Sequence, residues 1–84
     1  MSNPEEIDVI KLFQEAAFEV SGRKLEGLTL DTPLAELALD SVIVLEVVSH
    51  VEQTLGVRFE DEDLAHLTTM RDLRALVQKA RRAA

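Results

Sequence analysis

Apolar side chains recur along the chain with the period of an α-helix rather than that of a strand. The first apolar segment is preceded by signals of a helix start. Asn3 can cap the helix, Pro4 suits its first position, and Glu6 lies three residues after Asn3, as in a capping box. Ser21-Gly22 suits a helix end. We therefore expect a first helix from about Asn3 or Pro4, with an apolar face made of Ile7, Ile10, Phe13, Ala17 and Val20.

A long loop is expected at residues 21–40, where leucines recur without a turn-by-turn period. A loop of this length is unusual in a small domain, so its leucines are expected to lie against the core. Asp31-Thr32-Pro33 is typical of a helix start and predicts a short helical turn at Leu34–Leu37.

Residues 41–55 give conflicting signals. They are rich in β-branched valine and isoleucine, which favour a strand. The polar positions are nevertheless spaced at i, i+3, i+4 and i+7, which is one face of a helix. Fifteen residues are also long for a strand. We predict a helix capped by Asp40 or Ser41 and ended by Gly56.

The residues after Gly56 predict a connector, a short helix and a final helix. Phe59 is expected to enter the core, and Glu60–His66 to form a short helix with acids in its first turn. Thr69 and Asp72 have the spacing of a capping box before an amphipathic helix that ends in basic residues. The fold class is therefore all-α: a small antiparallel bundle of three longer helices and one short helix, with a long loop between the first two. Residues 1–84 are expected to form a single domain.

Composition excludes several classes of function. The 84 residues hold 16 Asp and Glu against 9 Lys and Arg, a formal charge of −7, with no Trp, Tyr or Cys. We expect no nucleic-acid binding, because basic charge and stacking aromatics are lacking. No leader or membrane span is recognisable, so we expect a cytoplasmic protein, and its net charge favours a monomer.

The charge is unevenly distributed. No Lys or Arg occurs between Lys24 and Arg58, although that stretch holds six acids. Such runs are usually a solvated surface. Here the acids have no local cations, so the pattern indicates an anionic docking face for a basic partner.

Candidate chemistry is sparse, and we do not expect an enzyme. His50 and His66 lack metal-site spacing, and the scattered glycines form no phosphate loop. Ser41 lacks the glycines of a nucleophile elbow. Two interpretations of Ser41 remain open. It is either a helix-capping serine or an exposed site of modification at a helix start, where an attached phosphate is favoured.

Residues 36–42, Glu-Leu-Ala-Leu-Asp-Ser-Val, resemble the D-S-L site of acyl carrier proteins. The similarity continues through Leu55-Gly56, through residues 59–63 and through residues 67–73, so that it covers essentially the whole chain. The resemblance implies that Ser41, beside Asp40, receives a 4′-phosphopantetheine arm from coenzyme A through a separate transferase that uses Mg²⁺. The arm's thiol would carry acyl or aminoacyl groups as thioesters, and the carrier itself would catalyse nothing.

The resemblance also implies partners and their contacts. These are the phosphopantetheinyl transferase and acyl-loading, acyl-transfer or condensing enzymes with basic docking patches. The matching docking positions are Asp40, Val42, Leu45, Glu46, Ser49 and Glu52, with Glu60 and Glu62 flanking them. We further expect that the thin core can admit a short acyl chain among Val44, Val47, Val51, Leu55, Phe59 and Leu67.

Three departures from the family pattern bear on the pathway. Ala38 stands where glycine is usual, Val42 where leucine is usual, and Ser49 where a bulkier apolar residue is often found. They favour polyketide or related specialised biosynthesis, with primary fatty-acid synthesis and peptidyl carriage left open. The alternative from another class is an unmodified acidic interaction module in which Ser41 is only a cap.

Overall fold

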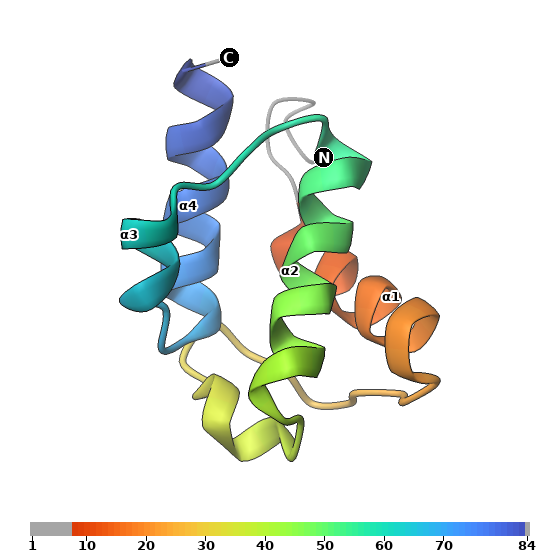
Figure 1. Ribbon diagram of the computed structural model, residues 1–84. Helices are drawn as coiled ribbons and strands as arrows, with labels where there is room; N and C mark the ends of the chain where they lie inside the picture. Colours follow the sequence, from red (N-terminus) through yellow and green to blue (C-terminus); the bar gives the residue numbers. More distant parts are fainter. Residues whose placement is uncertain (1–7, 84) are drawn as a thin grey trace, which may run out of the picture.

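The computed structural model describes residues 8–83, which fold into a small all-α bundle (Figure 1). The prediction of an all-α class and a small helical bundle is thereby confirmed. Within residues 8–83, the only strand pairing is an isolated antiparallel bridge between Pro33 and Thr69. No helix in this part of the chain is long and apolar enough to cross a membrane. The helical segments are α1 (Val9–Ser21), the 3₁₀ turn η1 (Leu34–Leu37), α2 (Ser41–Leu55), α3 (Asp61–Ala65) and α4 (Met70–Ala83).

Helix α1 begins at Val9, where the Asp8 side chain caps it by accepting a hydrogen bond from the Lys11 N–H at 3.1 Å. The predicted start at Asn3 or Pro4 lies outside the described residues. The predicted end is confirmed. Gly22 takes the left-handed conformation at φ 73°, and its N–H donates to the Phe18 carbonyl.

Helix α2 has the predicted bounds. The helical spacing of its apolar residues therefore outweighs the preference of its valines for a strand. Its buried residues, Val47, Val48 and Val51, lie on one face, as helical spacing requires. Asp40 is the cap, because its Oδ1 accepts a hydrogen bond from the Ile43 N–H at 2.9 Å. Gly56 ends the helix at φ 67°, which an L-residue adopts only with strain.

The core lies where α1, α2 and α4 meet. Phe13 is fully buried, and Phe59 is 6% exposed in the core position predicted for it. Leu25 and Leu34 from the segment after α1 are also buried, so this segment covers the core as expected. The other core residues are Val9, Ala16, Ala17, Val47, Val48, Val51, Met70, Leu73 and Val77.

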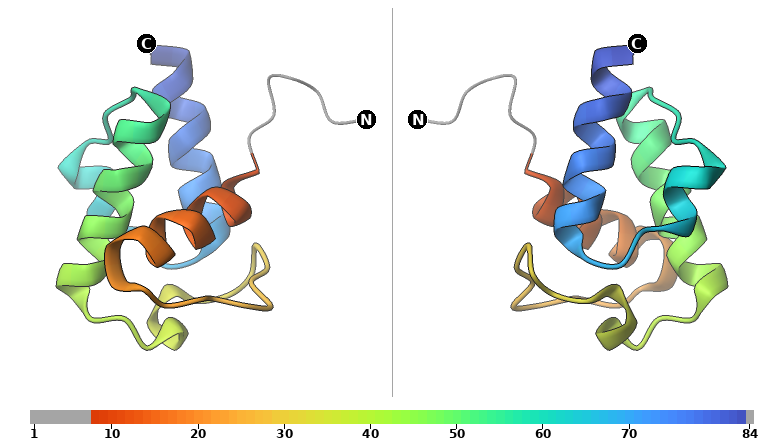
Figure 2. Two further views of the ribbon diagram at one scale, coloured as in Figure 1. Left: turned by 90° about the vertical axis from the view of Figure 1, so that its right-hand side faces the viewer. Right: turned by 90° about the vertical axis from the view of Figure 1, so that its left-hand side faces the viewer.

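The directions of the helices are mixed. Helices α2 and α4 run the same way, because the connection through α3 returns the chain along the length of α2 (Figure 1). Helix α1 lies across them (Figure 2). The bundle is therefore not antiparallel throughout, and α1 and α3 lie on opposite sides of α2 (Figure 1).

The long segment between α1 and η1 is bonded to the start of α4. The Leu34 N–H donates to the Thr68 carbonyl at 2.8 Å, and the Arg71 N–H donates to the Leu30 carbonyl at 2.8 Å. Arg71 also pairs with Asp31 at 2.9 Å on the surface. These bonds satisfy backbone groups of a segment without regular structure, and they fix where η1 and the start of α2 lie.

The predicted capping box at the start of α4 is present. Asp72 Oδ2 accepts hydrogen bonds from the Thr68 hydroxyl at 2.6 Å and from the Thr68 and Thr69 N–H groups at 3.0 and 3.1 Å. In return, the Asp72 N–H donates to Thr69 Oγ1 at 3.3 Å. These bonds, the Thr68 hydroxyl first, lower the pKa of Asp72 below its ordinary value of 3.8.

We predict that Asp72→Asn lowers the urea midpoint of unfolding near neutral pH, because an amide accepts these hydrogen bonds more weakly than a carboxylate does. A depressed folded-state pKa contributes stability above pH 3.8 that is lost as the pH falls through the folded value. The midpoint difference between Asp72→Asn and the parent should therefore shrink below pH 3.8. Glu36→Gln at an exposed position of η1 is the matched control. A difference that does not change with pH would refute the assignment.

Candidate functional site

Ser41 is the first residue of α2, and its side chain is exposed. Among the described residues, its hydroxyl has no hydrogen-bond partner. The capping bond to the Ile43 N–H comes from the neighbouring Asp40. Of the two caps left open by the sequence, the structure selects Asp40. The Ser41 hydroxyl is therefore free to react, at the positive end of a 15-residue helix.

The backbone before Ser41 is strained at Ala38. This residue has φ 56° and ψ 31°, the left-handed conformation that ends η1. Its carbonyl accepts a hydrogen bond from Arg23 Nη1 at 2.7 Å. Arg23 thus holds the residue at which the chain turns from η1 towards α2. Sequence analysis did not identify Arg23, because the contact joins residues fifteen positions apart.

A crevice of about 360 Å³ opens beside Ser41. Its walls come from η1 and the residues that join η1 to α2, from the first half of α2, and from α3 and the segment that follows α3. Apart from Ser41 all of its lining residues are apolar: Leu34, Ala35, Leu39, Val44, Leu45, Val48, Leu64 and Leu67. Its volume is at the small end of the range for ligand pockets, roughly 300–1,000 Å³.

The crevice differs from the acyl-chain region expected from the sequence. Of those six expected residues it contains Val44 and Leu67. Val47, Val51 and Phe59 are buried in the packed core instead, and Leu55 is half-buried. Leu34, Leu39 and Leu64 were missed, because the bonds to the start of α4 and the packing of α3 bring these loop and short-helix leucines to Ser41.

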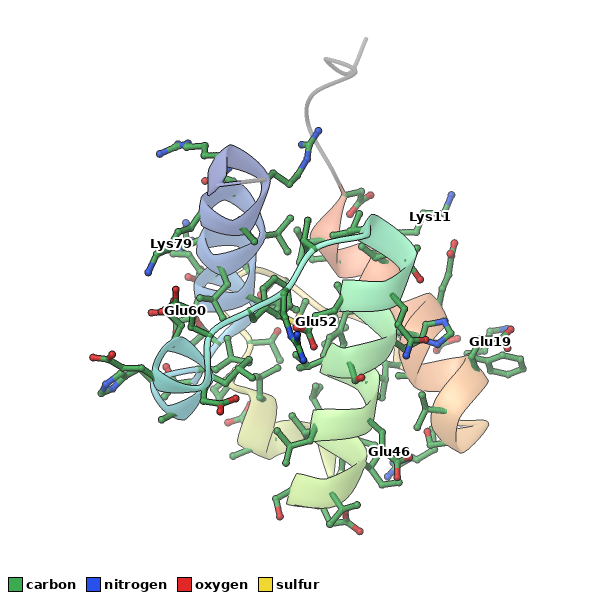
Figure 3. All side chains as sticks on the ribbon, turned by 45° about the horizontal axis from the view of Figure 1, so that its top comes forward. Lys11, Glu19, Glu46, Glu52, Glu60 and Lys79 are labelled. Carbon is green, nitrogen blue, oxygen red and sulfur yellow. The ribbon has the colours of Figure 1, made fainter. Side chains whose placement is uncertain are left out.

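The exposed face of α2 carries two large apolar side chains next to Ser41. Val42 is 62% and Leu45 56% exposed. Glu46 and Ser49 are exposed on the same helix, and Figure 3 shows Glu46 on the lower half of α2. The structure thus presents these four expected docking positions of α2 to solvent, and Asp40 just before the helix is exposed as well. Large exposed apolar groups of this kind mark interaction surfaces.

The other expected docking acids have different surroundings. Glu52 is half-buried, and its Oε2 accepts a hydrogen bond from the Phe59 N–H at 2.7 Å (Figure 3). It therefore holds the connector after α2. Glu60 and Glu62 are exposed but act on Lys79. The bond from Lys79 to Asp63 at 2.9 Å is the main cause that raises the pKa of Lys79, and the charges of Glu60 and Glu62 raise it further. Figure 3 places Glu60 near Lys79 and far from Glu46.

Metal ligands are not gathered anywhere in residues 8–83. No group of three His, Cys, Asp or Glu side chains within this range has a metal-binding arrangement. His50 is half-buried on α2, and His66 is exposed after α3. The candidate functional site is therefore Ser41 together with the apolar crevice beside it.

Comparison with known proteins agrees with this geometry. The family model described as a phosphopantetheine attachment site matches residues 11–77. An acyl carrier protein of Rhodococcus erythropolis is 33% identical over 73 residues, which is 86% of this chain and 80% of the relative. The solved acyl carrier protein of Thermotoga maritima superposes with a TM-score of 0.81 at 29% identity, covering 94% of this chain and 96% of that one.

A shorter match has higher identity. The anthracycline acyl carrier protein DauA of Streptomyces sp. (strain C5) is 43% identical over 49 residues. The aligned part spans 58% of this chain and 58% of that relative. The anthracycline acyl carrier protein DpsG of Streptomyces peucetius gives the same figures.

We predict that Ala38→Gly raises the free energy of unfolding by about 0.5–1 kcal/mol. Left-handed backbone costs an L-residue roughly 1–2 kcal/mol, and the greater freedom of glycine in the unfolded chain offsets part of this gain. Ala35→Gly in η1 is the matched control and should destabilise, since Ala35 is not among the residues with positive φ. Urea unfolding measures both variants. Equal loss of stability in the two would show that the strain at Ala38 is absent in solution.

Proposed function

Because the chain belongs to the acyl carrier protein family, a family of phosphopantetheine-bearing carriers rather than catalysts, we propose that Ser41 is the attachment site of the prosthetic arm. The observation that carries this proposal is the free, exposed hydroxyl of Ser41 beside the apolar crevice. The alternative of an unmodified module required Ser41 to be the helix cap. Asp40 fills that role.

The surroundings of Ser41 fit a 4′-phosphopantetheine group. The start of a long helix favours a phosphodiester there, and the crevice offers apolar contact nearby. The chain has no cysteine of its own. When bound, the group supplies a terminal thiol that holds acyl or aminoacyl cargo as a thioester. Asp40 keeps the start of α2 in place, and Arg23 holds the turn before it.

The attachment reaction balances with coenzyme A as the donor. Ser41 Oγ would bond to the phosphorus next to pantetheine, while the phosphoanhydride bond breaks. Adenosine 3′,5′-bisphosphate would leave, and the hydroxyl proton would be released. A separate phosphopantetheinyl transferase with Mg²⁺ would perform this step.

Partner enzymes would meet the α2 face. We propose Val42 and Leu45 as its apolar anchors and Asp40, Glu46 and Ser49 as its polar contacts, with acyl-loading, acyl-transfer or condensing enzymes supplying basic patches. Glu52 holds the Phe59 backbone, and Glu60 and Glu62 lie near Lys79, whose pKa their charges raise. We give these three a secondary role in docking.

The biosynthetic class follows from the relatives and from the docking face. Two relatives are named for anthracyclines, and Val42 and Ser49 change the family's usual contacts. We therefore propose that this carrier serves polyketide or related specialised biosynthesis. Fatty-acid synthesis and peptidyl carriage are the alternatives. We also propose that residues 1–84 act as a single cytoplasmic, monomeric domain.

We predict that the chain gains the mass of one phosphopantetheine when it is incubated with coenzyme A, Mg²⁺ and a promiscuous transferase. Ser41→Ala should gain none, yet unfold within about 0.5 kcal/mol of the parent, because the cap is Asp40. Ser21→Ala, at the last residue of α1 and outside the docking face, should gain the full mass. Intact-mass measurement distinguishes these outcomes. Modification of Ser41→Ala would disprove the assignment.

We predict that Leu45→Ser raises the KM for the same transferase about tenfold with little change in kcat, since an exposed anchor contributes binding energy of more than about 1 kcal/mol. Raising the salt concentration should also raise KM, because screening weakens charge-guided docking. Ala75→Ser on the exposed side of α4 is the control. Equal effects of the two substitutions would argue against docking through α2.

A further inference from the structure

A second and larger hollow lies on the α1 side of α2, opposite the crevice beside Ser41. Its volume is about 740 Å³. It is bounded by α1, by residues 24–26 and by the second half of α2, where His50 and Thr54 face α1. Leu12, Ala16, Phe18 and Leu25 supply its apolar surface. We call this hollow the α1–α2 groove.

The side chain of Phe18 in the α1–α2 groove is not part of the packed core. The chain has three phenylalanines, and Phe13 and Phe59 are buried in the core. Phe18 is 55% exposed. Aromatic side chains are enriched at protein interfaces, where they dominate binding energy. An exposed phenylalanine beside a groove therefore points to a partner that covers it.

The charge of the groove defines what kind of partner fits. Glu15, Glu19 and Glu26 line it, against a single Lys24. Within residues 8–83, none of these three acids has a salt-bridge or hydrogen-bond partner for its side chain. Glu15 and Glu19 are one helical turn apart, so their like charges repel each other. A cationic group placed between them would relieve that repulsion.

Other occupants match the groove less well. The chain's own residues 1–7 contain Glu5 and Glu6, which have the same sign as the groove. A second copy carries a formal charge of −7, so two copies repel each other at long range. Small-molecule pockets enclose most of their ligand within apolar walls, whereas three acids line this hollow and Phe18 is half-exposed.

We propose that the α1–α2 groove is a second docking surface, which takes a cationic segment of a partner protein and places an apolar side chain of that segment against Phe18. The groove lies beside the α2 face but on the other side from the crevice. A partner can therefore occupy it without covering Ser41. The proposal does not depend on whether Ser41 is modified.

The test uses the full chain, labelled with ¹⁵N, and a synthetic amphipathic peptide with lysines on one face and leucines on the other. The amide signals of Ala16, Phe18, Leu25 and Thr54 should shift on one common binding curve. Phe18→Ser should weaken that curve about tenfold, as loss of an aromatic anchor does. Leu45→Ser is the matched control, because Leu45 is 56% exposed on the α2 face, and it should leave the groove curve within about twofold.

The double variant Glu15→Gln/Glu19→Gln gives a separate measurement that leaves Phe18 intact. It should weaken the same curve and reduce its dependence on salt. Shifts confined to residues 42–49, or an unchanged curve for Phe18→Ser with native amide dispersion, would overturn the proposal. Concentration-dependent shifts of the groove signals without peptide would also overturn it, since they would identify a second copy as the occupant.

Discussion

The structure depends on a short set of backbone bonds between residues 30–34 and residues 68–71. Leu34 donates to Thr68, Met70 donates to Thr32 at 3.3 Å, and Arg71 donates to Leu30. An irregular segment with buried leucines has carbonyl and N–H groups that need partners, and the start of α4 supplies them. These bonds place η1, and η1 in turn sets the direction from which the chain enters α2. The capping box of Asp72 fixes the start of α4, so that its backbone groups are in place to bond residues 30–34.

The position of Ser41 depends on these bonds and on further bonds near the start of α2. Arg23 holds the carbonyl of Ala38, Asp40 caps α2, and the leucines of η1 and α3 line the crevice beside the serine. Within residues 8–83, the Ser41 hydroxyl itself makes no hydrogen bond. The bonds that support the local fold and the hydroxyl proposed to carry the prosthetic arm therefore belong to different residues, so the proposed modification would leave those bonds intact.

The surface is divided by charge as well as by shape. Basic residues gather in α4, where Lys79 pairs with Asp63 and Arg71 pairs with Asp31. The acids of α1 and of the exposed part of α2 form no salt bridge within residues 8–83, although Lys24 lies among those of the α1–α2 groove. A basic partner is therefore steered towards α1 and α2 and away from α4. These two helices also carry exposed apolar side chains, Leu45 on α2 and Phe18 on α1.

The sequence by itself determined the helical periods, the glycines that end α1 and α2 and the capping box before α4, and it indicated Ser41 as the proposed attachment site. Helical spacing made residues 41–55 a helix in spite of their valines, because burial of one apolar face outweighs a small propensity difference. Capping depends on neighbours within four residues, so Gly22, Gly56 and the Thr69–Asp72 pair were readable from local sequence. Ser41 was proposed as the site because residues 36–42 resemble the D-S-L site of acyl carrier proteins, which is likewise a pattern of neighbouring residues.

Only the tertiary structure decided what surrounds that site. The lining of the crevice, the bond from Arg23 to Ala38, and the use of Glu52 by the Phe59 backbone all join residues far apart in the sequence or across a turn. Helical periodicity shows which face of a helix is apolar but not which segment covers it. Packing decided that Val47 and Val51 fill the core while Leu39 and Leu64 reach Ser41, because side-chain contacts depend on how the elements are placed in space.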